Sequence, residues 1–365
     1  MHKCLVCNTV SSLISGEIGV CPECIRKNKG NAMSIAGKIQ KWSRVTFNLP
    51  ETPPKAASGI PCNLCVNECI IPKNERGYCG AIKNINGKLP KAKETKGYLS
   101  WYHEPLPTNC VADWVCAGGT GTGYPEYSHY AGAETGYKSL AAFFHTCTFN
   151  CLFCQNWHYK RETLKGKERT IHEFTADVDK KTSCICFFGG DPAPQLPFAI
   201  RASREALKKK NGKILRICWE TNGSMVTELM DKMVELSLTS GGCLKFDLKT
   251  WDENLHIALT GVTNKKTKEN FIRVGEKIKD RPVPPLLVAS TLLIPGYIDE
   301  KEIKNISRFI ASVNPEIPYN LLAFYPNFYM SDMPLTRRRF AENCLQIAKK
   351  EGLKNVIIGN THMLV

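Results

Sequence analysis

The chain has 365 residues, of which 43% are hydrophobic and 23% are charged, an ordinary composition for a globular protein. No apolar run approaches the ~18 residues that a membrane-spanning helix needs, and the N-terminal "MHKCLVC" has no apolar signal core. These features argue against a membrane protein. We expect a cytoplasmic protein with one large domain and an appendage, or with two domains.

Cysteine content and charge are both unusual. The chain has 18 cysteines, and clustered thiols in a reducing compartment bind metal or carry out redox chemistry more often than they form disulfides. The net charge of +15 is uneven, because residues 1–100 hold 15 lysines and arginines against 6 aspartates and glutamates. Such a basic region attracts nucleic acid, acidic proteins or anionic small molecules, or is simply a solvated surface.

Residues 1–50 are expected to form a small metal-binding module that resembles a zinc ribbon. Cys4, Cys7, Cys21 and Cys24 make two CxxC pairs separated by thirteen residues, a spacing typical of one tetrahedral zinc site. Iron and unliganded thiols are the alternatives. A bound zinc ion would replace the hydrophobic core that so short a module lacks.

Residues 51–135 are expected to form a cysteine-rich linker, auxiliary metal and lid region. The stretch 31–60 contains "NLPETPPKAASG", whose proline and small residues are typical of a linker. Four further thiols follow, at Cys62, Cys65, Cys69 and Cys79. They can hold zinc or an auxiliary iron–sulfur cluster, or they are buried structural cysteines. Cys110 and Cys116 lie near enough in sequence to join or compete with them.

Residues 136–365 alternate between strand and helix patterns. Short apolar runs end in polar or glycine-rich residues: "LAAFFHT", "SCICFFGGD", "KILRICWETNG", "CLKFDLKT", "PLLVASTLLIPG", "PYNLLAFYP" and "NVIIGN". Helical patterns such as "PFAIRASREALKKKNG" and "FAENCLQIAKKEGL" lie between them. This alternation predicts an α/β fold of parallel strands with crossover helices, and a partial (β/α)6 barrel is the favoured architecture.

Unusual residues stand at the carboxyl ends of these predicted strands. Cysteines follow the first, Gly-Gly-Asp follows the second, Glu-Thr-Asn-Gly ends the third, and Asp and Lys lie on the fourth. In parallel α/β barrels this rim carries the chemistry. We therefore expect these side chains to surround one mouth of the barrel.

The first of these motifs, "CTFNCLFCQN", places Cys147, Cys151 and Cys154 at a spacing of three and then two residues. A [4Fe–4S] cluster has four irons, and three thiolates ligate only three of them. The fourth iron is left open for a small molecule that chelates it through amino and carboxylate groups.

This motif and its neighbours resemble the radical S-adenosylmethionine (SAM) superfamily. Cx3Cx2C with Phe153 before the last cysteine is the signature of that superfamily, and "FFGGDP" is similar to its Gly-Gly-Glu motif with Asp191 in place of Glu. "WETNG", "FDLKTWDENLHIALTGVTN" and "TLLIPGYID" resemble segments of pyruvate formate-lyase-activating enzyme. "GIPCNLCVNECIIPKNERGYCGAIKN", "FYPNFYMSDMPLT" and "GLKNVIIGN" resemble the AmmeMemoRadiSam branch of these proteins, so the likeness extends over residues 60–360.

The resemblance implies a site for the cluster and for SAM. Cys147, Cys151 and Cys154 would be the catalytic ligands of the cluster, and Phe153 would lie near the adenine. The other implied contacts are Gly189, Gly190 and Asp191 to the methionyl amino group, Asp247 to the ribose, Lys249 to the SAM carboxylate, and Glu220 to the ribose or the substrate. Residues 136–365 would then be a radical SAM barrel.

Each implied contact has a simpler alternative. Asp247 and Lys249 could form an internal ion pair. Gly189 and Gly190 could serve only a tight turn between strand and helix. Glu220 could be a helix cap or a solvated carboxylate.

The chain also departs from the activating enzymes. Tyr325, in "AFY", stands where they have a histidine that touches the ribose of SAM, and the terminal "NTHMLV" lacks the cysteines common in the resembling branch. There is no ferredoxin-like Cx2Cx2Cx3C insertion. The added segment "EPLPTNCVADWVCAGGTGTGYPEYSHY" could be a lid over the barrel mouth, a surface that accepts a polypeptide, or an ordinary packed loop.

Three functions compete on these grounds. The favoured one is a radical SAM enzyme that abstracts hydrogen from a polypeptide, as a glycyl-radical activase or as a protein C-methyltransferase with cobalamin, supplied with electrons by a flavodoxin or ferredoxin. The second is RNA modification, which the zinc-ribbon-like and basic N-terminal part favours. The third is a non-catalytic metal-binding or interaction protein.

Overall fold

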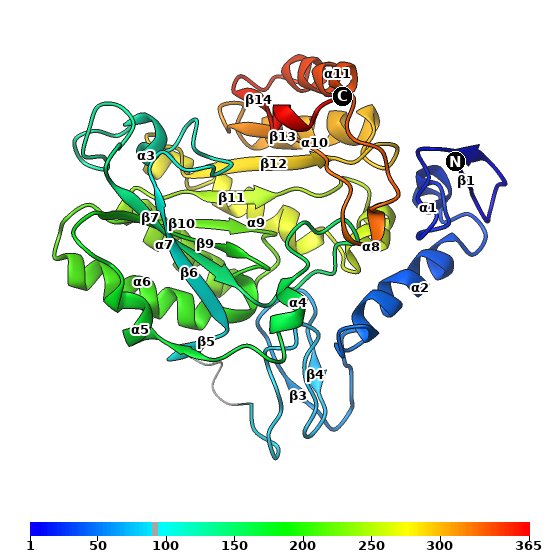
Figure 1. The fold of residues 1–365 in the computed structure, drawn as a ribbon, viewed down its shortest axis with the longest axis horizontal. Helices are drawn as coiled ribbons and strands as arrows, with labels where there is room; N and C mark the ends of the chain where they lie inside the picture. Colours follow the sequence, from blue (N-terminus) through cyan, green and yellow to red (C-terminus); the bar gives the residue numbers. More distant parts are fainter. Residues whose placement is uncertain (90–93) are drawn as a thin grey trace.

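One large sheet dominates the computed structural model, which describes residues 1–89 and 94–365 (Figure 1). Eight strands of this described part pair in the order β14-β13-β12-β11-β10-β9-β7-β6. All neighbouring pairs are parallel except β6 and β7, which are antiparallel. In chain order the strands are β6 (Leu99–Pro105), β7 (Lys138–Phe144), β9 (Thr182–Gly189), β10 (Arg216–Thr221), β11 (Leu244–Asp247), β12 (Leu287–Leu293), β13 (Tyr319–Ala323) and β14 (Val356–Gly359).

The strand pattern confirms the α/β class. Each of the seven apolar runs that predict a strand overlaps one of the parallel strands. Within the described ranges the sheet therefore has one parallel strand more than the six of the expected partial barrel, and β6 adds an antiparallel edge from the segment before residue 136. Since β14 and β6 end the order, the described sheet stays open.

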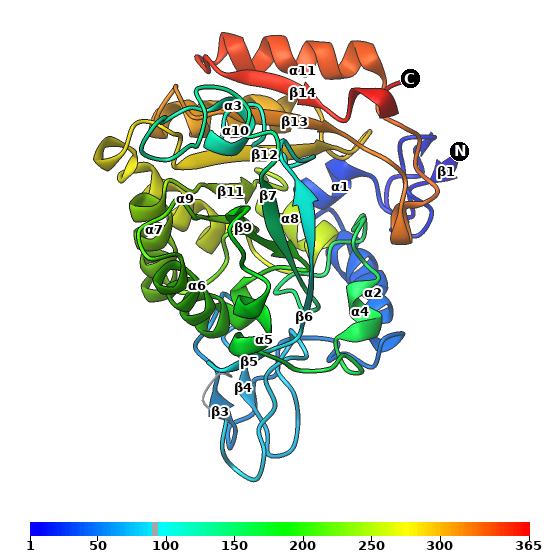
Figure 2. The same cartoon turned by 60° about the vertical axis from the view of Figure 1, so that its left-hand side comes forward.

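Helices cover the outer face of the sheet (Figure 2). They are α5 (Ile171–Ala176), α6 (Leu196–Lys210), α7 (Thr227–Ser240), α8 (Glu253–Thr260), α9 (Lys265–Gly275), α10 (Glu300–Val313) and α11 (Arg338–Lys350). The two helical patterns quoted from the sequence are confirmed by α6 and α11. Aspartates cap two of the helices, because Asp252 accepts from the Leu255 amide at the start of α8 and Asp299 from the Glu302 amide at the start of α10.

The two faces of the central strands carry different residues. On the outer face Phe187 and Trp219 are buried beneath the helices, with their ring centroids 4.7 Å apart. Because side chains alternate along a strand, the inner face receives Cys186, Cys218 and Glu220 instead. The interior of the open barrel is thus lined by thiols and charges, which is where chemistry rather than packing is expected.

The N-terminal module packs against the sheet domain instead of hanging from it. It comprises β1 (His2–Lys3), β2 (Val10–Ser11) and α1 (Pro22–Arg26). The Arg26 guanidinium forms an ion pair with Asp299 at 2.7 Å. The buried Tyr297 hydroxyl donates to the Val20 carbonyl and accepts from the Ser15 amide.

The stretch 31–60 is not the plain linker that its prolines suggest. Helix α2 (Ala32–Val45) occupies its first half, because small and apolar residues recur there at helical spacing and bury one face. The side chain of Asn150, in the cysteine motif, donates to Gln40 and Ser43 of this helix at 2.8 and 2.7 Å. Figure 1 shows α2 running from the N-terminal module towards the β3–β4 region.

Residues 51–89 form a small loop-rich unit beside the cysteine motif. Its strands are β3 (Ile60–Pro61) and β4 (Ile70–Ile71), which pair antiparallel. Ile71 and Tyr78 are buried in a cluster that includes Phe149, between the first two cysteines of the motif. Further along, β5 (Lys96–Gly97) pairs with β8 (Arg169–Thr170).

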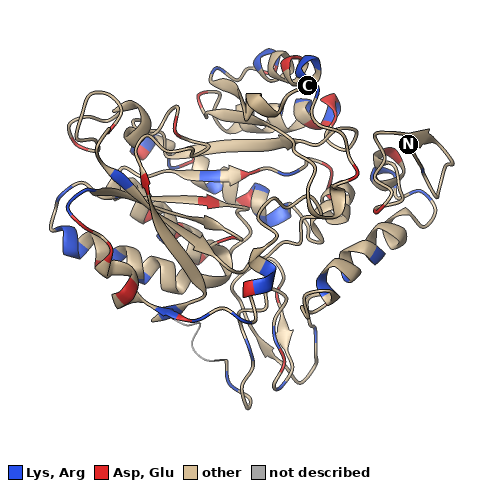
Figure 3. Ribbon diagram, in the orientation of Figure 1, with Lys and Arg blue, Asp and Glu red and all other residues tan. Residues whose placement is uncertain are grey.

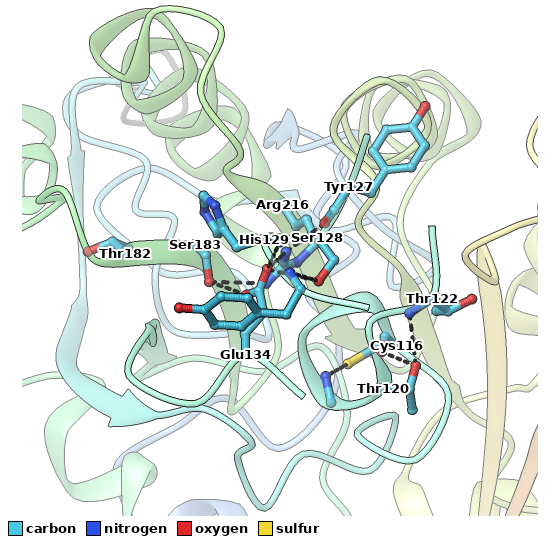
Figure 4. A network of polar contacts seen from close by, with 12 residues as sticks. Cys116, Thr120, Thr122, Tyr127, Ser128, His129, Glu134, Thr182, Ser183 and Arg216 are labelled. Atoms are coloured by element: carbon cyan, nitrogen blue, oxygen red, sulfur yellow. Dashed lines mark hydrogen bonds and ion pairs between the residues drawn. The ribbon is translucent and has the colours of Figure 1, made fainter. Parts of the chain in front are cut away.

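The added segment between β6 and β7 packs into the barrel, and its Asn109 and Val111 line the cavity at the carboxyl ends of the strands. It contains α3 (Ala117–Thr120), and its Ala112 is buried against Cys243 and Val288 near the amino ends of β11 and β12. Figure 4 shows how it is fastened, with Glu134 facing Arg216 and Ser183. The Arg216 guanidinium donates to both Glu134 oxygens at 2.9 and 2.6 Å, and the Ser183 hydroxyl donates at 2.7 Å.

The basic residues do not gather on one element of the fold. Lysines and arginines are spread over many elements (Figure 3). Across residues 1–89 and 94–365, no helix combines the length and the apolar character needed to cross a membrane.

The Glu134–Arg216 pair predicts a strong and pH-dependent effect on stability. Burial alone would raise the pKa of Glu134, but the hydrogen bonds and charge of Arg216 lower it from 4.5 to about 2. Glu134→Gln leaves a buried guanidinium without its counter-charge and should cost about 3–5 kcal/mol of unfolding free energy at neutral pH. Because the folded pKa is depressed, this difference should be complete above pH 4.5 and shrink as the pH falls towards 2.

Urea unfolding of both proteins over this pH range measures the difference. Glu342→Gln, at an exposed position of α11, is the control. A difference that does not change with pH would contradict the ionised buried pair.

Candidate active site

A cavity of about 380 Å³ opens at the carboxyl ends of the parallel strands. Each residue that the sequence analysis assigns to the cluster or to SAM lines this one cavity: Cys147, Cys151, Phe153, Cys154, Gly189, Gly190, Asp191, Glu220, Asp247 and Lys249. They come from four consecutive strands of the sheet and the turns that follow them. The structure thus brings together residues that are up to about a hundred positions apart in the chain.

The three cysteines stand on the loop that leaves β7. Cys147, Cys151 and Cys154 are free thiols, and the Phe149 amide donates to the Cys147 sulfur at 3.3 Å. The loop is fixed on both sides, since Asn150 is bonded to α2 and the Asn150 and Leu152 amides donate to the carbonyls of Thr260 and Leu259. A loop held in this way presents its sulfurs in a fixed arrangement.

This donor set fits a [4Fe–4S] cluster better than a single ion. Around one zinc ion, Zn–S bonds of ~2.3 Å place tetrahedral sulfurs only about 3.8 Å apart. Among the described residues, the trio does not form a group whose ligand atoms all lie within 4.8 Å of one another. The wider spacing, three soft donors and an amide aimed at one sulfur are what a polynuclear cluster requires.

Gly189 and Gly190 are needed for close approach as well as for the turn. Gly189 has a φ of +104°, which side chains with a Cβ rarely adopt. A Cβ on Gly190 would lie 2.3 Å from the Thr146 carbonyl oxygen. Gly189 and Gly190 therefore form the tight turn between strand and helix that was expected as the simpler alternative. This turn packs closely against Thr146, at the start of the cysteine loop.

Asp191 is buried at the centre of this turn. Its carboxylate accepts from the amides of Ala193 and Asn222 at 2.8 and 2.7 Å and from the Thr221 hydroxyl at 3.1 Å. Burial raises its pKa to about 6 in spite of these donors. Asp191 thus ties the ends of β9 and β10 together beside the cavity.

Asp247 and Lys249 form the internal ion pair that the sequence alternative describes, at 2.9 Å, and both still line the cavity. Asp247 also accepts from Lys245 at 3.0 Å and from the Ser290 hydroxyl at 2.7 Å. Burial alone would raise the pKa of Asp247, but Lys245 and Lys249 hold it well below its usual range. The carboxylate is therefore ionised.

Glu220 is neither a helix cap nor a solvated carboxylate. It lies within β10, and its two oxygens face different partners. Oε2 is 3.3 Å from the Lys245 ammonium, and Oε1 accepts from the Cys110 thiol at 3.4 Å. Cys110 therefore belongs to the barrel interior.

Several residues of the cavity wall were missed by sequence reasoning. Lys245 lies inside an apolar strand run, where an interior-facing lysine gives no signal of its own. Asn222 donates to Thr148 at 2.7 Å and lies 3.9 Å from the Cys147 sulfur. From the terminal "NTHMLV", Asn360 and His362 reach the wall, whereas Tyr325 is 51% exposed and does not line the cavity.

The four N-terminal cysteines meet as a compact group. All ligand atoms of Cys4, Cys7, Cys21 and Cys24 lie within 4.8 Å of one another. The Cys7 and Cys21 sulfurs are 3.7 Å apart, close to the edge of about 3.8 Å expected for a zinc tetrathiolate. The donor set fits a single thiophilic ion.

The second group of four cysteines is arranged differently. Cys62, Cys65, Cys69 and Cys79 line one narrow cavity, but within the described ranges they do not form a group whose sulfurs all lie within 4.8 Å of one another. Neither Cys110 nor Cys116 joins them, because both pack with Cys218 and Cys243 inside the barrel. The spacing that disfavours a single zinc ion at the cysteine trio disfavours one here as well, so an auxiliary cluster or unliganded thiols fit this donor set better.

The chain is similar to one protein family and to several known proteins. Residues 142–310 match the family described as the radical SAM superfamily. An uncharacterized protein of Methanocaldococcus jannaschii is 22% identical over 82% of this chain and 81% of its own length. A protein of the same organism that is named as a glycyl-radical enzyme activating enzyme is 28% identical over 52% of this chain and 69% of its own length.

Among solved structures, a domain of pyruvate-formate lyase-activating enzyme from Bacteroides vulgatus has 26% identity and a TM-score of 0.40. The match covers 48% of this chain and 98% of that domain.

Proposed function

We propose that the protein, whose residues 142–310 match the radical SAM superfamily, cleaves SAM at a [4Fe–4S] cluster and abstracts hydrogen from a polypeptide. The observation that carries this proposal is the common cavity, whose wall contains the cysteine trio together with all seven residues assigned to SAM. Its volume of about 380 Å³ suits a cofactor of nucleoside size.

The residues of the cavity wall would bind the cluster and orient SAM beside it. Cys147, Cys151 and Cys154 hold three irons and leave one open, and the bound cluster would supply the electron that splits SAM into methionine and a 5′-deoxyadenosyl radical. Phe153, buried in the wall, offers an apolar face to the adenine. Gly189 and Gly190 let the backbone approach the methionyl group, with Asp191 holding the turn in place.

Charge in the wall matches the charges of SAM. Lys249 lies beside the trio and supplies a cation for the carboxylate of SAM, while Asp247 supplies an acceptor for the ribose hydroxyls. Lys245 neutralises Asp247 from the opposite side, so Lys249 is not fully consumed by its internal ion pair. This network allows Lys249 to turn towards a ligand without leaving a buried carboxylate unpaired.

The polypeptide substrate is supported by the name of a relative. That M. jannaschii relative is named as an activator of glycyl-radical enzymes, which makes its target a protein. A flavodoxin or ferredoxin is the proposed electron donor for the present chain. Zinc is the proposed ion at the N-terminal quartet, where it would fix the module that supports α2 and, through Asn150, the cysteine loop.

Lys249→Ala tests the proposed SAM contact. The variant should keep its cluster, since Asp247 retains Lys245 as a partner. It should bind SAM about 10- to 150-fold more weakly, corresponding to the 1.5–3 kcal/mol of a hydrogen bond to a charged group. Equilibrium binding of SAM to the reconstituted proteins measures this, with the exposed Lys354→Ala as control. Equal affinity in Lys249→Ala and wild type would refute the contact.

Cys151→Ala tests the reaction itself. Removal of one of three ligands should eliminate the absorbance of the SAM-binding cluster, after iron at other sites is accounted for, and with it the formation of 5′-deoxyadenosine under reducing, anaerobic conditions. Cys344→Ala removes a buried thiol of α11 that lies outside the cavity and should retain both.

Deuterium tracing then identifies the substrate class. Label that moves from a candidate protein into 5′-deoxyadenosine supports the proposed polypeptide substrate. Label that moves only from RNA, or SAM cleavage that persists in Cys151→Ala, would contradict the proposal. Cobalamin bound after reconstitution, together with methyl transfer, would assign the methyltransferase instead of the activase.

A further inference from the structure

A second group of potential metal ligands lies inside the barrel, below the SAM cavity. It consists of Cys110, Cys186 and Glu220, whose ligand atoms all lie within 4.8 Å of one another. Within the described ranges, the N-terminal quartet is the other group of His, Cys, Asp and Glu side chains this compact. The interior trio draws one residue from the loop after β6, one from β9 and one from β10.

Strand register fixes two of the three ligands. Cys186 of β9 is directly opposite Cys218 of β10, and Glu220 is two residues further along the same face of β10. The side chains between them, Phe187 and Trp219, are buried on the opposite, helix-covered face. Cys186 and Glu220 are therefore diagonal neighbours on the inner surface of the barrel.

The third ligand is held by the packed segment between β6 and β7. Next to Cys110, the Val111 carbonyl accepts from the Asn320 side chain of β13 at 3.2 Å, and Ala112 is fully buried. Further along, the Glu134–Arg216 ion pair fastens the segment to the start of β10 (Figure 4). These contacts on either side hold the Cys110 sulfur inside the barrel.

Distances match those of a thiophilic ion. With Zn–S of ~2.3 Å and Zn–O of ~2.0–2.2 Å, a tetrahedral site has sulfur and oxygen ligands about 3.5 Å apart. The Cys110 sulfur is 3.4 Å from Glu220 Oε1. The Cys186 ligand atom lies within 4.8 Å of both.

The residues around Glu220 are also of the kind found around metal-binding carboxylates. Glu220 Oε2, the oxygen turned away from Cys110, is 3.3 Å from the buried Lys245 ammonium, which Asp247 holds in turn at 3.0 Å. Ligating carboxylates are commonly oriented by such an outer partner. Two thiolates and one carboxylate carry three negative charges; a divalent ion would neutralise two of them, and the third is partly offset by Lys245, whose ammonium is shared with Asp247.

We propose that Cys110, Cys186 and Glu220 bind a thiophilic divalent cation of the Zn²⁺ class. Three protein ligands leave a fourth position, and because one of the three, Glu220, is part of the cavity wall, this position would open on the side of the cavity. Zinc sites with three protein ligands and an open position bind water or substrate. The ion would therefore anchor a donor group of the substrate at the bottom of the cavity, and Glu220 would serve the metal and not the ribose of SAM.

Cobalt(II) titration of the metal-free, full-length chain under anaerobic conditions tests this site, with Co²⁺ alone as the probe. Cys110→Ala and Cys186→Ala should each bind one equivalent of Co²⁺ less than the wild type and lose part of the thiolate-to-cobalt charge-transfer absorbance. Cys184→Ala is the matched control, because Cys184 lies two residues before Cys186 on the same face of β9 but outside the trio. It should keep the wild-type stoichiometry.

Two further variants separate ligand loss from misfolding and from the other thiols. Glu220→Gln keeps the size of the side chain and should weaken Co²⁺ binding at this site at least tenfold while the chain unfolds at a midpoint close to that of the wild type. Combined Cys4→Ala and Cys186→Ala should lose two equivalents, one from the N-terminal quartet and one from the barrel.

Wild-type stoichiometry in both Cys110→Ala and Cys186→Ala would overturn the proposal. So would a Cys110–Cys186 disulfide detected by mass spectrometry in the anaerobically prepared chain. Since the measurement needs neither SAM nor the cluster, its outcome is independent of whether the protein cleaves SAM.

Discussion

Compensation of buried charge at the mouth of the sheet is the constraint on which the rest of the structure depends. Glu220 and Asp247 are partly buried in the cavity wall, and an unpaired carboxylate there would lose part of its solvation without compensation. Lys245 bridges the two carboxylates, and Lys249 adds a second cation on the side of the cysteine loop. The pairing of β10 with β11 places Glu220 opposite Lys245. This pairing allows a polar cavity to lie beside the cysteine loop.

Two parts of the first 89 residues support the cysteine loop. Helix α2 receives hydrogen bonds from Asn150, and the unit at residues 51–89 packs Ile71 and Tyr78 against Phe149. The module that precedes α2 and the unit at residues 51–89 each carry a group of four cysteines, and bound metal can stabilise a small unit that lacks a core. The segment between β6 and β7 packs into the barrel near the amino ends of β11 and β12.

The sequence predicts what depends on local patterns and misses what depends on distant contacts. The parallel strands follow from apolar runs, and the shared cavity follows because the carboxyl ends of parallel strands meet at one rim. Helix α2 is not predicted, because the prolines that follow it are typical of a linker. Lys245 lies within an apolar run, and the meeting of Cys110 with Cys186 and Glu220 depends on strand register and on a packed loop, neither of which leaves a pattern in the sequence.

The central claim is that three thiolates hold a cluster whose fourth iron is free to bind SAM. Mössbauer spectroscopy of the reconstituted, full-length protein, recorded before and after SAM is added, tests it most directly. We expect one iron of each SAM-binding cluster to change its coordination when SAM binds, while the other three keep their signals. Four irons that are all unaffected by SAM would contradict the account, because the site would then have no position at which the reaction could begin.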